Sequence, residues 1–404
     1  MSDGRPGGAP CVGTPVRICF LDSFPRMGGA EQSLVELLRH LDRRRFRPFF
    51  VASEEGEVSQ EVRKLGIPVL FCPLPRNVSV LSRTALRFSS LARVPVHLLA
   101  YLRRLAGTIR SVHPHLTYSN SLKDHLASAF LACVVRRPVV WHFRDLLEKK
   151  VLRDFVEAVA LAAPVHLIAN SHFTAGQFPR LSRRPGRVTV VYNGLDLDAI
   201  DRARRLAPSG DVPASSGLVV GLVGALCPEK GQRLLIRSLP ALAQKLPEVS
   251  CWIVGEEIYS TSRHEKGYRG TLERLAGELG VKDRVHFLGW RKDVMALLQR
   301  MDILVCASDP AIFVETFGRA VVEAMACEKP VVAVASGGLR ETVVDGVTGA
   351  LFEPYSPEAL VGAILRLAAS PAHMRRMGQA GRRRAEELFT SRKYVEGVET
   401  CLVN

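Results

Sequence analysis

The stretch VRICFLDSFPRMGGAEQSLVELL, residues 16 to 38, holds the pattern that decides the fold. Residues 16–21 form a short apolar run with β-branched and aromatic side chains, which is typical of a buried strand. Gly28 and Gly29 then open a segment in which leucines recur at helical spacing. A buried strand, a loop and an amphipathic helix predict one unit of a parallel sheet that is covered by helices.

The same unit recurs along most of the chain. Further strands are expected at 48–52, 68–71, 115–118, 139–143, 165–170, 188–192, 218–223, 250–254, 284–288, 303–306 and 330–333. Helical patterns separate many of them, among them 58–65, a long segment to about 112, 123–135, 231–246, 270–279, 294–300 and 319–327. This alternation predicts an α/β protein with two tandem Rossmann-like, doubly wound domains that face each other across a cleft.

A change of texture marks the domain boundary. Residues 204–217, RRLAPSGDVPASSG, are rich in proline, glycine and serine. We therefore expect a disordered N-terminus over 1–13, a first domain over 14–205, a linker over 206–217 and a second domain over 218–385. The remaining residues, 386–404, are expected to form a terminal helix.

Composition restricts the class of protein. The chain has 404 residues, 47% hydrophobic content and nine cysteines, which stand singly and indicate a reducing compartment. No signal peptide and no 18-residue apolar span is recognised, so a cytoplasmic protein is expected, at most peripheral on the inner face of the cell membrane.

The net charge of +15 is large enough to imply an anionic partner. Between Arg83 and Arg110 arginines alternate with leucines, a pattern of basic amphipathic helix that favours an anionic membrane surface. A solvated basic face is the alternative. Nucleic acid is not expected, since no nucleic-acid-binding motif accompanies the charge.

The stretch FVETFGRAVVEAMA, residues 313 to 326, carries two glutamates eight positions apart, Glu315 and Glu323. If a helix begins near Phe317-Gly318, its free N–H groups form an anion site. The two carboxylates would then flank a phosphate and accept hydrogen bonds from sugar and ribose hydroxyls. That arrangement suits a nucleotide sugar, and the alternative is ordinary helix stabilisation by acidic residues.

Three other stretches offer candidate groups. In GLVGALCPEKGQRLL, residues 221 to 235, Lys230 precedes a helix and could neutralise a diphosphate leaving group. Gly28-Gly29 marks a close backbone approach in the first domain. In VVWHFRDLL, residues 139 to 147, His142, Arg144 and Asp145 emerge where an apolar strand stops, although a lone histidine is more often structural.

In order and spacing these stretches resemble the family 4 glycosyltransferases, retaining enzymes with the two-domain GT-B fold. The resemblance rests on the Glu-x7-Glu pair and on short motifs that cover nearly all of the chain: Gly28-Gly29-Ala30-Glu31, Asn170-Ser171, Asn193-Gly194-Leu195-Asp196, Pro228-Glu229-Lys230-Gly231 and Phe287-Leu288-Gly289-Trp290.

The resemblance implies roles for these residues. Glu315 would contact the donor sugar, Glu323 the ribose and Lys230 the diphosphate, while Leu288-Gly289 would lie beside the base. The donor-binding set is Gly28, Gly29, Lys230, Leu288, Gly289, Glu315, Thr316, Phe317, Gly318, Arg319 and Glu323. Glu315, Lys230 and His142 would be catalytic, and His142, Arg144 and Asp145 would lie on the acceptor side.

The resemblance also implies an activity. The chain would transfer a hexose-type sugar from a UDP-, GDP- or ADP-sugar to a hydroxyl of a glycan or lipid-linked glycan, in cell-surface polysaccharide synthesis. It would retain the anomeric configuration and need no metal or other cofactor. The first domain would bind the acceptor, the second would bind the donor, and the terminal helix would cross back to the first domain.

Two departures from the family pattern qualify these roles. Ala225 stands where the family has a second diphosphate-binding arginine, which Arg319, Arg340, Arg144 or Arg26 could replace. The usual His-Asp pair is Arg144-Asp145 here, with His142 two residues earlier. The alternatives are a catalytically degenerate partner that binds nucleotide or glycan, and a sugar-nucleotide epimerase.

Overall fold

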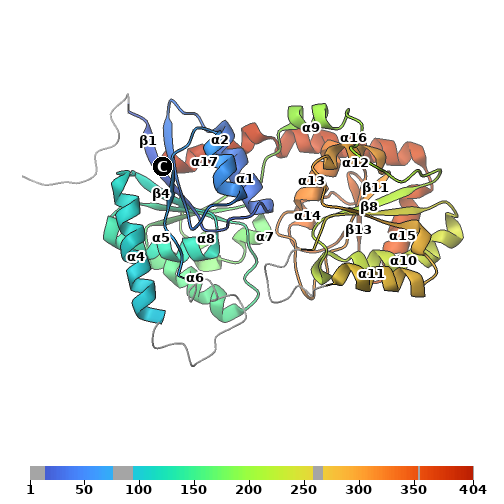
Figure 1. Ribbon diagram of the computed structural model, residues 1–404, viewed down its shortest axis with the longest axis horizontal. Helices are drawn as coiled ribbons and strands as arrows, with labels where there is room; N and C mark the ends of the chain where they lie inside the picture. The colour runs from blue at the N-terminus through green and yellow to red at the C-terminus, as the bar shows by residue number, and fades with distance from the viewer. Residues whose placement is uncertain (1–13, 76–93, 258–266, 354, 404) are drawn as a thin grey trace, which may run out of the picture. The chain divides into compact units, whose positions relative to one another are not determined.

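The computed structural model describes residues 14–75, 94–257, 267–353 and 355–403, which form two compact units (Figure 1). The first unit contains the described residues up to Asn170, together with Thr174–Val191 and the chain from Tyr394 onward. The second contains Ser171–Phe173 and Tyr192–Lys393.

The first unit is built on a seven-stranded parallel sheet in the order β3-β2-β1-β4-β5-β6-β7. Its strands are β1 (Val16–Asp22), β2 (Phe46–Ala52), β3 (Val69–Phe71), β4 (Leu116–Ser119), β5 (Val139–Phe143), β6 (Val165–Ala169) and β7 (Val188–Val190). The order reverses at β1, so the carboxyl ends of β1 and β4 define the switch point where such sheets bind ligands.

Helices cover both faces of this sheet. In Figure 1, α1, α2 and α17 lie on one face and α4, α5 and α6 on the other. The helices of this part of the chain are α1 (Gly29–His40), α2 (Glu57–Lys64), α4 (Val94–Ser111), α5 (Leu122–Val135), α6 (Lys150–Ala162), α7 (His172–Ala175), α8 (Pro179–Ser182) and α17 (Ser391–Val403).

Period-two alternation divides each strand between these two helix layers. In β1, Ile18 and Phe20 belong to the core that contains residues of α1 and α17, whereas Cys19 and Leu21 belong to the core under α4. Because both faces are covered, the central strands β1, β4 and β5 are largely buried on both sides.

The second unit has a six-stranded parallel sheet in the order β10-β9-β8-β11-β12-β13. Its strands are β8 (Val219–Val223), β9 (Ser250–Val254), β10 (Val285–Gly289), β11 (Ile303–Cys306), β12 (Val331–Val334) and β13 (Gly349–Phe352). Its helices are α9 (Leu197–Ala203), α10 (Gln232–Lys245), α11 (Tyr268–Glu278), α12 (Val294–Arg300), α13 (Arg319–Ala326), α14 (Leu339–Thr342), α15 (Pro357–Ala368) and α16 (Pro371–Leu388), with short 3-10 turns η2 (Pro228–Lys230) and η3 (Lys282–Arg284).

The predicted fold class is confirmed, because both sheets are parallel and each carries helices on two faces. The division of the chain differs from the expected linker at 206–217, since it falls between Val191 and Tyr192. The reason is α9, which packs on α12 and α13 and contributes Ile200 to the core of the second unit.

The structure also differs from the expected elements at the last strand and at the terminal helix. The sequence pattern missed β13, a short edge strand that begins at a glycine and pairs with β12. The expected terminal helix over 386–404 is the end of α16 followed by α17, with a break at 389–390. The expected disorder at 1–13 and the first part of the basic segment, with Arg83, Arg87 and Arg93, lie outside the described residues.

Candidate active site

Lys230 is held at the carboxyl end of β8 by a turn that requires glycine. The turn η2 ends at Lys230, and Gly231 follows with a left-handed φ of +77° before α10 begins. A Cβ atom at Gly231 would lie 1.8 Å from the carbonyl oxygen of Ala307, which follows β11. The close approach of these two backbones fixes Lys230 beside the loop that leaves β11.

That loop brings Glu315 to Lys230. Glu315 Oε1 accepts hydrogen bonds from Lys230 Nζ at 2.6 Å and from Ser308 Oγ at 2.9 Å. The Lys230 ammonium also lies 4.5 Å from the centre of the Phe313 ring. Burial lowers the pKa of Lys230, but the charge and hydrogen bond of Glu315 outweigh it, so the net pKa is raised and the lysine is charged at neutral pH.

The backbone of Glu315 is locked by the glycine pair Gly337-Gly338. The N–H of Gly338 donates to the carbonyl oxygen of Glu315 at 2.8 Å. A Cβ at Gly338 would lie 2.0 Å from the carbonyl oxygen of Thr316, and one at Gly337 would lie 2.3 Å from Val314 Cγ1. Side chains are excluded here, so the loop around Glu315 and Thr316 rests directly on backbone.

Helix α13 begins without a side-chain cap. Its N-cap, Gly318, has a φ of +81° and no side chain that could accept from the first turn. Phe317 is 3% exposed and packs edge-on against Phe389, so only its backbone can face a ligand. The N-terminal end of α13 can therefore supply N–H donors and a positive dipole to an anion.

Glu323 lies one turn further along α13. Its side chain is 13% exposed, and its Oε1 accepts from Arg319 Nε at 2.8 Å. Burial raises the pKa of Glu323, and the charge of Arg319 opposes this shift. The carboxylate is thus partly withdrawn from water but remains at the surface of the unit.

Leu288 and Gly289 end β10 at the same edge of the sheet. Gly289 has a φ of +67°, and its carbonyl oxygen accepts from the N–H of Gly255 at 2.8 Å. A Cβ at Gly255 would lie 2.0 Å from the carbonyl oxygen of Gly224. The carboxyl ends of β8, β9 and β10 therefore meet through glycine backbone, and the sequence pattern had not singled out Gly255.

In the first unit, Gly28 and Gly29 differ in what they require. Gly28 is the N-cap of α1, and its N–H donates to Glu31 Oε2 at 3.1 Å, which is the one bond of a capping box that a glycine can make. A Cβ at Gly28 would lie 2.6 Å from that oxygen, whereas a Cβ at Gly29 would meet no atom within 4 Å. A side chain at Gly28 would therefore have to displace the Glu31 carboxylate, whereas open space remains beside Gly29.

His142 is not placed to contact a substrate. It lies within β5, is 0% exposed and hydrogen-bonds through Nδ1 to the Tyr118 hydroxyl. Burial, and then the charge of Arg144, lower the pKa of His142 well below its usual range, so the ring is neutral. His142 therefore lies inside the strand, which continues to Phe143, and not in the loop where the sequence analysis expected an acceptor-side group.

Arg144 is also buried, at 8% exposure. Its Nη1 donates to Asn120 Oδ1 at 2.5 Å and its Nη2 to the Tyr394 hydroxyl at 2.6 Å. Asn120 in turn donates to Asp22 at the end of β1, at 2.8 Å. Asp145 is partly exposed, and its carbonyl oxygen accepts from Gln177 Nε2 at 2.9 Å. Of the three acceptor-side candidates, Asp145 alone retains access.

Most of the arginines that could replace the one missing at Ala225 already form ion pairs or hydrogen bonds. Arg340 pairs with Glu353 at 2.9 Å, Arg319 with Glu323, and Arg144 lies in the buried network. The carbonyl oxygen of Ala225 itself accepts from Gln232 Nε2 at 2.7 Å. Lys230 is therefore the cation that the structure presents beside Glu315.

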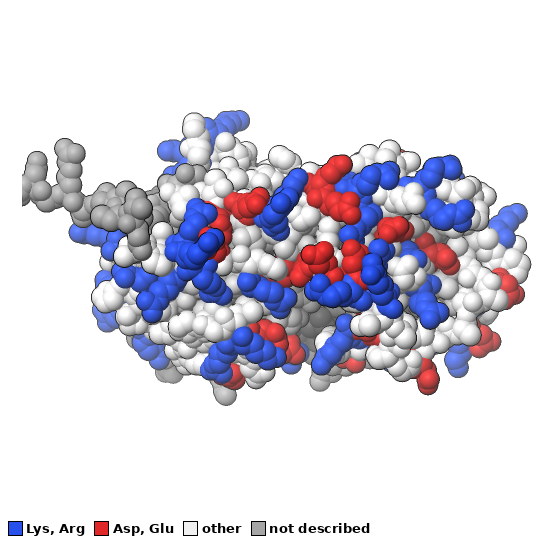
Figure 2. Space-filling view, turned by 90° about the horizontal axis from the view of Figure 1, so that it is seen from above, with Lys and Arg blue, Asp and Glu red and all other residues white. Residues whose placement is uncertain are grey.

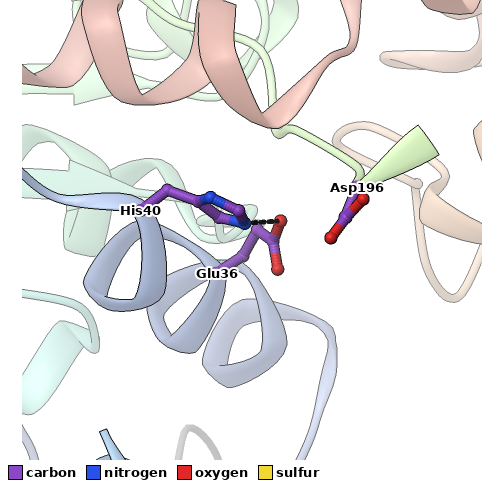
Figure 3. A group of neighbouring side chains, drawn as sticks. All are labelled: Glu36, His40 and Asp196. Atoms are coloured by element: carbon purple, nitrogen blue, oxygen red, sulfur yellow. Dashed lines mark ion pairs between the residues drawn. The ribbon is translucent and has the colours of Figure 1, made fainter. Parts of the chain in front are cut away.

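Glu36 and His40 of α1 form an ion pair at 3.1 Å (Figure 3). The pair has i,i+4 spacing at the carboxyl end of the helix, where helix electrostatics favour it. Asp196, also drawn, belongs to the second unit and accepts from the N–H of Ala199 as the cap of α9. Each carboxylate thus has a role within its own helix.

Two family models match the chain, and together they span both units. One, described as Glycosyltransferase Family 4, matches residues 27–199, and the other, described as Glycosyl transferases group 1, matches residues 212–384. The chain belongs to the family 4 glycosyltransferases. The predicted GT-B fold is likewise confirmed, by the two Rossmann-like units and by solved structures of similar fold.

The solved structures with this fold include complexes with a nucleotide. Anabaena HepE, in complex with UDP and glucose, is 26% identical with a TM-score of 0.78, over 96% of this chain and 99% of that one. Sucrose-phosphate synthase from Thermosynechococcus elongatus has a TM-score of 0.73 at 20% identity, over 96% of this chain and 98% of that one. At this identity the similarity supports the fold but not a shared function.

The chain spans about half the length of the curated relatives that it matches. It is 34% identical to a D-inositol 3-phosphate glycosyltransferase of Mycolicibacterium vanbaalenii, over 56% of this chain and 50% of that protein. It is 36% identical to the GDP-mannose-dependent alpha-(1-6)-phosphatidylinositol monomannoside mannosyltransferase of Mycolicibacterium smegmatis, over 46% and 47% respectively.

Two groups beside Glu315 were missed by sequence reasoning. Ser308 and Phe313 complete the contacts of the Lys230–Glu315 pair. Ser308 could have been found, since it is the second residue after β11 and polar side chains at strand ends face the ligand edge.

Among the helices of the described residues, none is long and apolar enough to cross a lipid bilayer.

Proposed function

We propose that this family 4 glycosyltransferase moves a hexose-type sugar from a nucleoside diphosphate donor to a hydroxyl of a glycan or lipid-linked glycan. The anomeric configuration would be retained, and the product would serve cell-surface polysaccharide synthesis. The observation that carries the proposal is the Lys230–Glu315 pair at the ligand edge of the second sheet, next to the uncapped end of α13.

The pair consists of a cation and a carboxylate, both of which would act in sugar transfer from a diphosphate. As the glycosidic bond breaks, negative charge develops on the leaving diphosphate, which Lys230 and the N–H groups of α13 would stabilise. Glu315 would accept hydrogen bonds from the sugar hydroxyls and so orient the anomeric carbon. Lys230 and the N–H groups of α13 would supply the positive charge for a reaction without metal.

Donor binding would exchange partners within the site. Lys230 Nζ now bonds to Glu315 at 2.6 Å, and both groups are largely withdrawn from water, at 27% and 15% side-chain exposure. A nucleotide sugar would offer phosphate oxygens to the lysine and hydroxyl donors to the glutamate. When the pair separates, the lysine would thus gain an anionic partner and the glutamate a hydrogen-bond donor.

The proposal is tested by donor hydrolysis without acceptor, measured as released nucleoside diphosphate. HepE was crystallised with UDP-glucose, and a mycobacterial relative is named for GDP-mannose, so these two donors come first, followed by other UDP-, GDP- and ADP-sugars. Release from one donor, unchanged in EDTA, is expected. Nucleotide binding without any turnover, with or without acceptor, would instead identify a degenerate partner, and sugar interconversion an epimerase.

We further propose that α4, α5 and α6 dock on an anionic membrane at the cytoplasmic face. Two i,i+4 pairs of exposed apolar side chains, Phe130 with Val134 on α5 and Val151 with Phe155 on α6, lie on neighbouring helices of one layer. Basic side chains on α4, and next to or at the ends of α5 and α6, are also exposed: Arg103, Arg104, Arg110, Arg136, Arg137, Lys149 and Lys150. Exposed apolar groups with flanking cations suit anionic lipid.

On the face shown in Figure 2, the positive charge is not concentrated in this way. On the face in Figure 2, lysines and arginines are spread over both units with acidic side chains among them. Net charge alone would therefore give weak, diffuse attraction, whereas the α4–α6 layer adds apolar side chains that can enter the headgroup region.

Charging this layer is expected to weaken vesicle binding at least about tenfold, since two phenylalanines would no longer be buried in the interface. The variant is Phe130→Glu with Phe155→Glu, and the matched control is Val347→Glu, an exposed apolar site of the second unit at 53% exposure. Co-sedimentation with phosphatidylglycerol-containing and pure phosphatidylcholine vesicles measures it. Equal binding by both variants, or no binding by the unaltered protein at low salt, would rule out the docking surface.

A further inference from the structure

The ion pair between Arg319 and Glu323 stands at the ligand edge of the second sheet. Arg319 is the first residue of α13, and its Nε donates to Glu323 Oε1, four residues later, at 2.8 Å. The two side chains are 24% and 13% exposed. The pair is therefore largely withdrawn from solvent, unlike exposed surface ion pairs, which contribute little to the stability of a protein.

Helix stability does not account for this pair. A cation in the first turn opposes the helix dipole, and a basic residue N-terminal to an acidic one is the less favourable order at i,i+4 spacing. Arg319 Nη1 is also buried and has no hydrogen-bond partner among the described residues, which carries a further cost. Three unfavourable contributions at one residue call for a role beyond folding.

The effect of Arg319 falls on Glu323. Burial raises the pKa of Glu323, and the charge and hydrogen bond of Arg319 lower it, so the arginine helps to keep the carboxylate ionised. The same bond occupies Oε1 and restricts rotation of the side chain. Within the described residues the other carboxylate oxygen has no hydrogen-bond partner, so it can accept from a ligand hydroxyl.

We propose that Arg319 is a positioning residue that holds the Glu323 carboxylate oriented toward the ribose hydroxyls of the donor, and so sets the preference for a ribonucleotide. The inference rests on the proposed function, in which Glu323 contacts the ribose. It assigns to the Arg319 side chain a task that is separate from the anion site made by the backbone of α13.

The test compares the affinity for a ribonucleoside diphosphate with that for its 2′,3′-dideoxy form, by calorimetric titration with UDP, GDP and ADP and their dideoxy counterparts. For the nucleotide that it binds, the unaltered protein is expected to prefer the ribose form over the dideoxy form by about 10- to 100-fold. This is the range for hydrogen bonds to a charged group. Arg319→Met should reduce this ratio to about twofold or less, whereas Arg319→Lys, which keeps the charge, should restore part of it.

Two further variants separate positioning from general damage. Glu323→Gln should lose the same preference, and the Arg319→Met/Glu323→Gln double variant should lose no more than either single variant, because the residues act through one contact. Arg269→Met removes a pair of the same geometry on α11, Arg269 Nε to Glu273 Oε1 at 2.8 Å, and should leave the ratio unchanged.

The outcomes distinguish this inference from the proposed function. If Arg319→Met keeps the full preference while Glu323→Gln loses it, the positioning role is overturned and nucleotide binding stands. If the unaltered protein binds a nucleoside diphosphate and its dideoxy form with equal affinity, the inference is also overturned. If no diphosphate binds at all, the proposed function fails and the inference fails with it.

Discussion

Replacing Glu315 by glutamine is expected to reduce sugar transfer by about 10²- to 10³-fold, the usual effect of removing one preorganised electrostatic contact to a transition state. Affinity for the nucleoside diphosphate should stay within about fivefold, because the diphosphate would be held by Lys230 and by the end of α13. The loss should therefore appear in kcat rather than in nucleotide binding.

The reason lies in how Glu315 is held. Ser308, Lys230 and the Gly337-Gly338 backbone fix its position, so glutamine can occupy the same space but carries no charge. In that variant Lys230 loses the attraction that raises its pKa, and burial alone then lowers it. Diphosphate affinity of Glu315→Gln should consequently decline at a lower pH than that of the unaltered protein as the pH is raised through the alkaline range.

The matched control is Glu353→Gln, which removes the carboxylate of the exposed Arg340–Glu353 pair at 2.9 Å. Its transfer rate should be unchanged, since pairs of this kind contribute little. Steady-state rates and direct titration of the diphosphate separate the two variants. A fully active Glu315→Gln enzyme would remove the central assignment, and a collapse of nucleotide affinity would move Glu315 from the sugar to the diphosphate.

The sequence predicted the second unit well for a physical reason. Buried parallel strands read as short apolar runs, and polar residues just beyond their ends lie at the ligand edge, so the neighbourhood of Lys230 and Glu315 follows from periodicity and strand ends. It could not predict that the two pair directly, because the contact joins residues 85 positions apart through a 2.6 Å bond set by loop geometry.

His142 shows a limit of the same reasoning. A polar residue near the end of an apolar run could belong to the strand or to the loop after it, and only the loop faces a ligand. Here β5 includes Phe143, which places His142 inside a sheet with both faces covered. The buried contact of Arg144 with Tyr394, 250 positions later, was equally beyond sequence reasoning.

Replacing Gly231 by alanine is expected to destabilise the second unit by about 2 to 5 kcal/mol. The left-handed conformation costs a non-glycine residue about 1 to 2 kcal/mol, and overpacking adds about 1 to 3 kcal/mol. The clash is with backbone, because the new Cβ would lie 1.8 Å from the Ala307 carbonyl oxygen. Neither η2 nor the end of β11 can move without displacing Lys230 or Ser308, so transfer should fall as well.

Gly280 provides the control, since its φ of +67° is similar but a Cβ there would meet no atom within 4 Å. Gly280→Ala should therefore lose only about 1 to 2 kcal/mol, from backbone conformation alone, and keep its activity. Native-state hydrogen exchange distinguishes the two: amides of β8 and β11 should exchange faster in Gly231→Ala, while those of β1 and β4 should not change. Equal losses in both variants would mean that the turn before α10 can relax, and that Lys230 is not fixed by its contact with β11.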